Sequence, residues 1–161
     1  PLNNSTQLDR VSGMVDRLPD HASVETGGTR QGERGYFYEP TLLANVGEND
    51  TIAQEEVFGP VLAVIAYEGV GEAGDTEAVR IANNPDFGLA GAVFGTDIER
   101  CRAVARGIRS GTISINGGMY YGPDAPFGGY KQSGIGREMG LAGFEEFLEM
   151  KTLAEPVVEA G

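Results

Sequence analysis

The sequence predicts an α/β fold with a mostly parallel sheet and crossover helices. Three apolar segments of strand length support this prediction, at residues 61–67, 88–95 and 111–116. Two stretches that favour helix, at residues 75–84 and 97–109, separate these segments. Strand, helix, strand, helix, strand is the order of right-handed crossovers between parallel strands. A chain of 161 residues has the usual size of one compact unit of this kind.

The N-terminal segment, residues 5–18, predicts an amphipathic helix that Pro19 ends. Apolar side chains recur in it at helical spacing, which indicates one face turned toward a core. Asn4 or Ser5 is placed to cap the first turn. The apolar positions are Leu8, Val11, Val15 and Leu18.

Three strands are expected after this helix. Residues 23–35 are polar and rich in glycine, which predicts a short strand followed by a loop or hairpin. Residues 36–46 are rich in aromatic and apolar side chains and favour a strand, with Pro40 placing its early part at an edge or bend. Residues 61–67 run apolar without alternation, which predicts a strand covered on both faces.

The C-terminal third is expected to be less regular. Asp97 predicts a helix cap before residues 98–109. Residues 117–136 are too rich in glycine and aromatic side chains to favour regular structure. A short helix at residues 137–144 and a last strand at residues 147–154 complete the predicted elements.

Charge and composition exclude several classes of function. The chain has 12 Lys and Arg against 24 Asp and Glu, and its net charge of −12 excludes nucleic acid as a partner. No run approaches the roughly 20 apolar residues of a membrane span. One cysteine cannot form an internal disulfide, which favours the cytoplasm, and one histidine excludes a His-rich metal site. The start at Pro1, without a signal-peptide pattern, indicates a truncated or processed N-terminus.

Cys101 is the only candidate nucleophile. Arginines at positions 100, 102, 106 and 109 would lower the pKa of its thiol if they lay close to it. However, Cys101 shares an apolar stripe of its helix with Ile98, Ala105 and Ile108, which favours a buried core cysteine. His21 is expected in a surface loop, so no hydrolytic triad is predicted.

The glycine-rich run at residues 128–140 invites comparison with phosphate-binding loops. Gly134 is followed by Ile135 rather than Lys-Ser or Lys-Thr, and the next glycine after Gly136 is Gly140, one position too late for the dinucleotide fingerprint. Glycine most often marks positive φ or a close backbone contact, so a structural loop is favoured.

Residues 54–60 place two carboxylates and an aromatic side chain before a strand. One interpretation is a solvated acidic turn with Phe58 in the core, and the residues alone favour it. The other is a ligand-binding edge, because loops at strand ends are where α/β proteins bind small molecules.

Three sequence blocks, in order and at family spacing, resemble the aldehyde dehydrogenase superfamily. Each block is moderately specific, and their ordered combination is very specific. The resemblance covers residues 1–156 and identifies the chain as the C-terminal part of such an enzyme. The blocks are Tyr38-Glu39-Pro40-Thr41-Leu42 with Glu55-Glu56-Val57-Phe58-Gly59-Pro60-Val61, Asn83-Asn84 through Phe87-Gly88-Leu89 with Ser110-Gly111-Thr112 to Asn116, and Pro126-Phe127-Gly128-Gly129-Tyr130-Lys131 through Gly134-Ile135-Gly136-Arg137-Glu138.

The resemblance implies roles in cofactor and substrate binding. It makes Glu56 the carboxylate that holds the nicotinamide ribose of NAD or NADP, and Phe58 the aromatic packed beside ribose and ring, which reverses the acidic-turn interpretation. It places Met119, Tyr121 and Phe127 along the path of a small-molecule aldehyde. Their apolar and aromatic side chains favour an apolar or aromatic aldehyde.

The resemblance also implies a homodimer or homotetramer. It divides the chain into a partial catalytic (substrate) domain, residues 1–144, and an oligomerisation strand and tail, residues 145–161. Glu149 resembles the glutamate that bonds an arginine, here Arg137, across the family's dimer interface.

The family's catalytic cysteine and general-base glutamate, and its cofactor domain, are expected N-terminal to the start of this chain. No residue of this chain is therefore assigned a catalytic or metal-binding role. Two other functions stay open: a non-catalytic binding or assembly module and, least favoured, a free-standing enzyme that uses Cys101.

Overall fold

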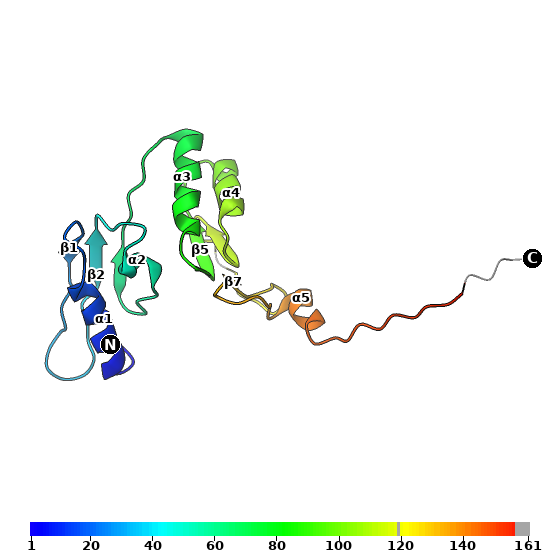
Figure 1. Ribbon diagram of the computed structural model, residues 1–161, viewed down its shortest axis with the longest axis horizontal. Helices are drawn as coiled ribbons and strands as arrows, with labels where there is room; N and C mark the ends of the chain where they lie inside the picture. The colour runs from blue at the N-terminus through cyan, green and yellow to red at the C-terminus, as the bar shows by residue number, and fades with distance from the viewer. Residues whose placement is uncertain (119, 157–161) are drawn as a thin grey trace, which may run out of the picture.

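The computed structural model describes residues 1–118 and 120–156, and it confirms the predicted α/β class (Figure 1). Helices and strands alternate along most of the chain, and each of the two parallel strand pairs is connected through a helix. In chain order the elements are α1 (Ser5–Asp16), β1 (Ser23–Thr26), β2 (Thr41–Ala44), α2 (Thr51–Gln54), β3 (Val61–Ala63), α3 (Gly71–Asn83), β4 (Phe87–Gly88), β5 (Ala90–Val93), α4 (Ile98–Gly107), β6 (Thr112–Ile115), β7 (Tyr130–Lys131) and α5 (Gly140–Glu145).

The strands form three small sheets rather than one. β1 pairs antiparallel with β2, and β2 pairs parallel with β3. β5 and β6 pair parallel on either side of α4, and β4 pairs antiparallel with β7. The crossover prediction is therefore confirmed for β5–α4–β6 and wrong for β3, which lies in a different sheet from β5. The expected strand at residues 88–95 divides into β4, which pairs with β7, and β5, which pairs with β6.

The main core lies where α1 packs on the sheet β1-β2-β3 and on α2. Apolar side chains of α1 meet side chains from β2 and α2, as the amphipathic pattern predicts. Asn4 is the N-cap, and its side chain accepts a 2.8 Å hydrogen bond from the Gln7 amide, while the helix ends at Asp16. The buried core residues are Leu8, Val11, Met14, Val15, Tyr38, Leu43, Val46 and Ile52.

The apolar run that contains β3 is covered on one face only. Val61, Ala63 and Ile65 pack against the α1 core, whereas Leu62 is 63% exposed and Val64 also faces outward. The prediction of a strand covered on both faces is therefore wrong for the described part of the chain. Successive side chains of a strand point to opposite faces, and α1 covers just one of these.

α1, α2 and the sheet β1-β2-β3 form the first, N-terminal lobe. The second lobe is built from α3, α4 and the β5–β6 pair. The Asp97 side chain caps α4 as predicted, accepting hydrogen bonds from the Glu99 and Arg100 amides at 3.0 and 3.1 Å. Asp75 was expected to begin α3, but the helix starts at Gly71. Asp75 instead forms a bidentate ion pair with Arg100 of α4, with both N–O distances 2.7 Å. This fork joins the two helices side by side.

From residue 148 to residue 156 the chain runs as an extended segment (Figure 1). α5 starts at Gly140, three residues later than predicted, after Met139 at φ 62°. The strand expected at residues 147–154 does not form within the chain, because a strand requires a hydrogen-bonded neighbour. The last backbone hydrogen bonds near α5 join Phe147 and Leu148 to its end, at 3.1 Å each.

No helix in residues 1–118 or 120–156 is both long and apolar enough to cross a membrane.

Replacement of a fully buried leucine should destabilise the N-terminal lobe far more than replacement of an exposed one. Leu43 is 0% exposed, so Leu43→Ala should lower the free energy of unfolding by about 2–5 kcal/mol. Leu62→Ala, on the neighbouring strand, should lower it by about 0.5 kcal/mol or less. Urea unfolding of both variants measures the difference. Equal losses would contradict the placement of the core.

Candidate functional site

The loop between α2 and β3 presents a carboxylate and an aromatic ring to solvent. Glu56 is exposed, and Phe58 is 73% exposed. The alternative in which Phe58 is tucked into the core is therefore wrong. Phe58 also has φ 57°, a left-handed conformation that costs a bulky residue about 1–3 kcal/mol. Such strained residues cluster at functional sites, where the surrounding structure has to hold them.

Two polar side chains of α1 hold the backbone of this loop. The Nε2 atom of Gln7 donates hydrogen bonds to the carbonyls of Val57 and Phe58, both at 2.9 Å. The Nη2 atom of Arg10 donates to the carbonyl of Glu56 at 2.8 Å and to the Glu55 carboxylate at 3.3 Å. Three successive carbonyls of residues 56–58 therefore face α1.

The end of the loop, at Gly59, lies directly against α1. A Cβ atom at Gly59 would be 2.6 Å from Cγ2 of Val11, so only glycine fits there without displacement. With its carbonyls turned to α1, the loop leaves the side chains of Glu56 and Phe58 on its open side. A free carboxylate can accept hydrogen bonds from two hydroxyls, and a free ring can pack on a planar group. This pair suits a ligand that carries both.

Glu56 and Phe58 form the first cluster of predicted site residues. Tyr121 and Phe127 form a second cluster, in the irregular segment after β6. Their rings meet edge to face, with centroids 5.5 Å apart and planes at 78°. Met119, predicted to line the same path, lies outside the described residues. Nearby, Tyr120 donates a hydrogen bond to Asp124, which raises the pKa of the tyrosine and lowers that of the carboxyl.

Among the described residues, the two clusters lie beside different cavities. A cavity of about 440 Å³ beside the first loop is lined by Leu2, Tyr38 and Gly59, among others. A cavity of about 510 Å³ beside the second segment is lined by Thr112 and Tyr120, among others. The two cavities share no lining residue.

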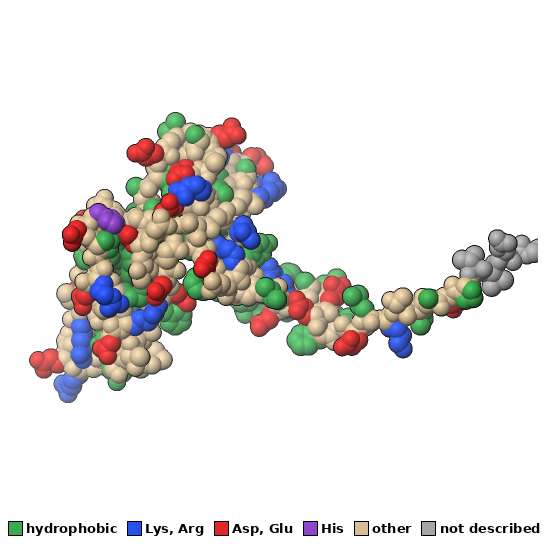
Figure 2. Space-filling view, in the orientation of Figure 1, with side chains coloured by type: hydrophobic (Ala, Val, Ile, Leu, Met, Phe, Trp, Pro, Cys, Tyr) green, Lys and Arg blue, Asp and Glu red, His purple; other side chains and the backbone are tan. Residues whose placement is uncertain are grey.

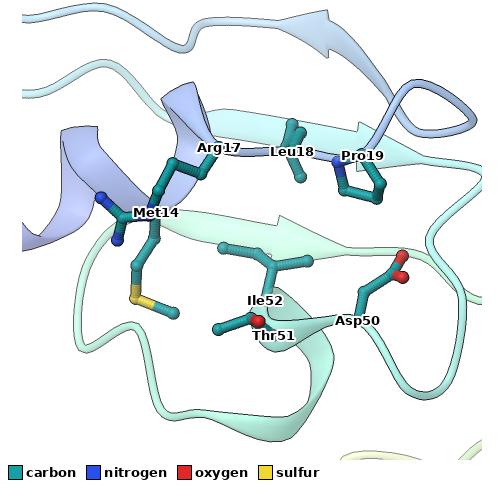
Figure 3. A pocket seen from close by; sticks show the side chains of 7 residues that line it. All are labelled: Met14, Arg17, Leu18, Pro19, Asp50, Thr51 and Ile52. Atoms are coloured by element: carbon teal, nitrogen blue, oxygen red, sulfur yellow. The ribbon is translucent and has the colours of Figure 1, made fainter.

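A further pocket, of about 290 Å³, lies between the end of α1 and α2 (Figure 3). Its charged side chains are Arg17 and Asp50. Asp50 accepts hydrogen bonds from the Gly47 amide at 2.7 Å and from exposed His21 at 2.9 Å, and these lower the pKa of the carboxyl. Asp50 thus stabilises its own turn, and His21 is the surface residue that was predicted. The apolar lining consists of Met14, Leu18, Pro19 and Ile52.

Cys101 is a core residue, as its apolar stripe predicts. It is 4% exposed, and a Cβ atom at Gly95 would be 2.8 Å from its sulfur. Two of the four flanking arginines are engaged elsewhere, because Arg100 pairs with Asp75 and Arg102 pairs with Glu99. These two arginines are therefore paired with carboxylates rather than with the thiol.

The glycine-rich run is a structural loop. The carbonyl of Gly136 lies where a side chain at Gly128 would be, which requires glycine at that position. Lys131 has φ 55°, and its ammonium donates hydrogen bonds to the carbonyls of Asn83, at 3.1 Å, and Pro85, just after α3. A lysine at the C-terminal end of a helix is favourably placed against the helix dipole.

Arg137 and Glu149 are not together within the chain. The guanidinium of Arg137 donates to the carbonyls of Gly129 and Gly136 at 2.9 and 2.7 Å and lies 5.2 Å from the ring centroid of Tyr130. Glu149 is exposed on the segment after α5. The contact between them across two subunits stays a prediction.

The described residues contain no group of three or more His, Cys, Asp or Glu placed to hold a metal ion.

Gln7 and Arg10 were not predicted from the sequence. Both lie on the polar face of α1, where side chains are ordinarily solvated. Their partners are 45 to 51 positions away in the chain, so no local pattern signals the contacts.

Comparison with known proteins matches the chain to one protein family. A family model described as "Aldehyde dehydrogenase family" matches residues 1–153. A relative from Staphylococcus saprophyticus, named "Putative aldehyde dehydrogenase", is 46% identical over 158 residues, which is 96% of this chain and 32% of the relative. A relative of the same description from Staphylococcus epidermidis has the same identity and coverage. The chain thus spans about a third of the length of the curated relatives it matches.

Solved structures of aldehyde dehydrogenases are also similar to this chain. Betaine aldehyde dehydrogenase from Staphylococcus aureus in complex with NAD+ is similar with a TM-score of 0.83 and 39% identity, over 91% of this chain and 29% of that one. An NAD+ complex of aldehyde dehydrogenase from Bacillus cereus matches with a TM-score of 0.83 and 38% identity, over 92% of this chain and 30% of that one.

The buried position of Cys101 makes a testable prediction about its reactivity. The folded chain should react with a disulfide reagent about 100-fold more slowly than the urea-unfolded chain, because reaction requires the lobe to open. The control is Cys101→Ala/Ala103→Cys, which moves the single thiol to an exposed position on the same helix. Equal rates for Cys101 and the control would contradict the core placement.

Proposed function

The chain belongs to the aldehyde dehydrogenase family, and we propose that it is part of an enzyme that oxidises an aldehyde to a carboxylic acid with NAD. The observation that carries this proposal is the loop held against α1, which leaves Glu56 and Phe58 free on its open side. NAD is favoured because structures similar to this chain are NAD+ complexes. NADP is the alternative cofactor.

Glu56 and Phe58 fit the nicotinamide end of such a cofactor. Among the described residues the Glu56 carboxylate has no side-chain hydrogen bond, so both its oxygens are free to accept hydroxyl hydrogens of a ribose. The exposed ring of Phe58 is two positions further along the chain and suits packing on a flat ring. When bound, the cofactor accepts the hydride that the aldehyde loses. The role of these two residues is to fix where that hydride acceptor lies.

No residue of this chain is assigned to the attacking cysteine or to the glutamate that activates water. Cys101 is unsuitable because it is buried in the second lobe. In the proposal, residues 1–144 contribute cofactor contacts and one wall of the substrate path to the enzyme, and residues 145–161 contribute to assembly. The cytoplasmic location indicated by the single cysteine stays a prediction.

Tyr121 and Phe127 support an apolar or aromatic aldehyde as substrate. Their edge-to-face pair presents apolar ring surface, and the residues next to them in the chain, Tyr120 and Pro126, line a cavity with the start of β6. Substrate pockets are lined mainly by apolar and aromatic side chains. Met119 is proposed to extend the same wall.

The segment after α5 supports assembly into a homodimer or homotetramer. Its apolar side chains are exposed, and they are visible along the extended segment in Figure 2. An extended segment with a free backbone edge can add to a sheet of another subunit. The exposed apolar residues are Phe147, Leu148, Met150 and Leu153.

Removal of the Glu56 charge should slow hydride transfer. In the intact enzyme, Glu56→Gln weakens the hold on the ribose, and a misplacement of about 1 Å costs roughly 100-fold in rate. Single-turnover kinetics measures the hydride step directly. Glu68→Gln, at an exposed carboxylate of the segment after β3, serves as control and should match the wild type. An unchanged hydride step in Glu56→Gln would refute the cofactor role.

Reversal of charge at Glu149 should weaken assembly. Glu149→Lys would place a cation near Arg137 of another subunit, where like charges repel. Sedimentation across a range of concentrations should show a shift toward smaller species, while Glu155→Lys, the same change in the same segment, should not. A monomeric wild type, or identical assembly of Glu149→Lys and wild type, would remove the basis for this interface.

A further inference from the structure

We infer that Arg10 of α1 is a positioning residue for the cofactor, acting together with Gln7 through the backbone of residues 56–58. The inference rests on the proposed function, because it concerns how Glu56 and Phe58 are aimed. Neither α1 side chain is required to touch the cofactor. Both act on carbonyls of the loop that carries the two contact residues.

The hydrogen bonds fix the loop at three successive peptide groups. Both amide hydrogens of Gln7 are used, one on the carbonyl before the Cα atom of Phe58 and one on the carbonyl after it. The two peptide planes that flank Phe58 are thereby held together, which defines its φ and ψ. Arg10 holds the preceding carbonyl, that of Glu56, with a charge-assisted bond of 2.8 Å.

This grip explains a conformation that the loop would otherwise avoid. Phe58 at φ 57° is strained, and a free loop would relax toward negative φ. Relaxation would rotate the ring and change the path of the loop that carries the Glu56 side chain two positions earlier. The bonds from α1 therefore stabilise one direction for both side chains before any ligand arrives, which is the meaning of preorganisation.

The helix itself is a rigid support for these bonds. Leu8 and Val11 are buried in the core, and Gln7 and Arg10 each precede one of them by one position. Residues three apart lie on the same side of a helix, so the polar pair runs beside the buried pair. The backbone positions of the polar pair are therefore fixed by the packing of the core.

The ion pair of Arg10 contributes little to stability. A structural role and a positioning role of Arg10 can therefore be distinguished by experiment. Arg10 and Glu55 are each about half exposed, at 43% and 54%, and exposed pairs of this kind have small effects on folding. A purely structural role would therefore leave function unchanged when Arg10 is replaced. A positioning role predicts a change in the hydride step with little change in melting temperature.

The test compares Arg10→Met, Arg10→Lys and Arg17→Met in the intact enzyme. Hydrogen exchange of the amides in residues 56–59 reports order in the loop, and single-turnover kinetics reports hydride transfer. Arg10→Met should speed exchange and slow hydride transfer about 10-fold, a part of the roughly 100-fold loss for a displacement near 1 Å. The KM for aldehyde and the melting temperature should stay close to wild type.

The other two variants are controls of opposite kind. Arg10→Lys keeps a cationic donor and should recover most of the rate, although its ammonium lacks the planar shape of the guanidinium and would hold the Glu56 carbonyl in a different geometry. Arg17→Met removes the arginine at the C-cap of the same helix, which has no hydrogen bond to the loop within the described residues, and it should behave as wild type.

Two results would overturn the inference and would also distinguish it from the proposed function. If Glu56→Gln slows hydride transfer and Arg10→Met changes neither exchange nor rate, the positioning role alone fails. If exchange rises in Arg10→Met but neither this variant nor Glu56→Gln affects hydride transfer or NAD affinity, the loop is held as described but has no cofactor role. In that case the proposed function fails and the inference fails with it.

Discussion

The hydrogen bonds from α1 to the carbonyls of residues 56–58 are the constraint on which the candidate site depends. They connect a helix fixed by its buried face to a loop that has no regular structure of its own. Phe58 keeps its strained conformation because two hydrogen bonds from Gln7 hold the peptide groups on both sides of it. The exposed carboxylate and ring of the site are therefore a consequence of helix packing, a link from core to function that spans 46 to 51 positions in the chain.

The outer surfaces show the same division between buried and free faces. β3 packs one set of its apolar side chains on the α1 core and leaves Leu62 and Val64 outward. The segment after α5 exposes four large apolar side chains without a neighbouring strand. Exposed apolar side chains of this kind are typical of surfaces that bind another polypeptide. It supports the proposal of assembly, whereas the ion pairs that join α3 to α4 and to the first lobe concern the fold of the chain itself.

Local patterns predicted the elements well and their partners less well. Helical spacing and caps at Asn4 and Asp97 predicted α1 and α4, because these signals depend on neighbours a few positions away. The single parallel sheet was only partly correct, since pairing of β3 with β2 rather than β5 is decided by packing between distant segments. Of the candidate site, Glu56 and Phe58 were assigned through family resemblance, not through periodicity. The grip of Gln7 and Arg10 had no sequence signal at all, because two polar residues on the exposed face of a helix are the ordinary case.

The central claim is that this loop holds the nicotinamide end of NAD in the geometry that α1 imposes. The most direct measurement is a crystal structure of the intact protein with NAD bound. The account predicts that both Glu56 carboxylate oxygens lie within hydrogen-bonding distance of the nicotinamide ribose hydroxyls, with Phe58 still at positive φ and its ring against the ribose. A ribose bound elsewhere, or a Phe58 that relaxes to negative φ when NAD binds, would contradict it.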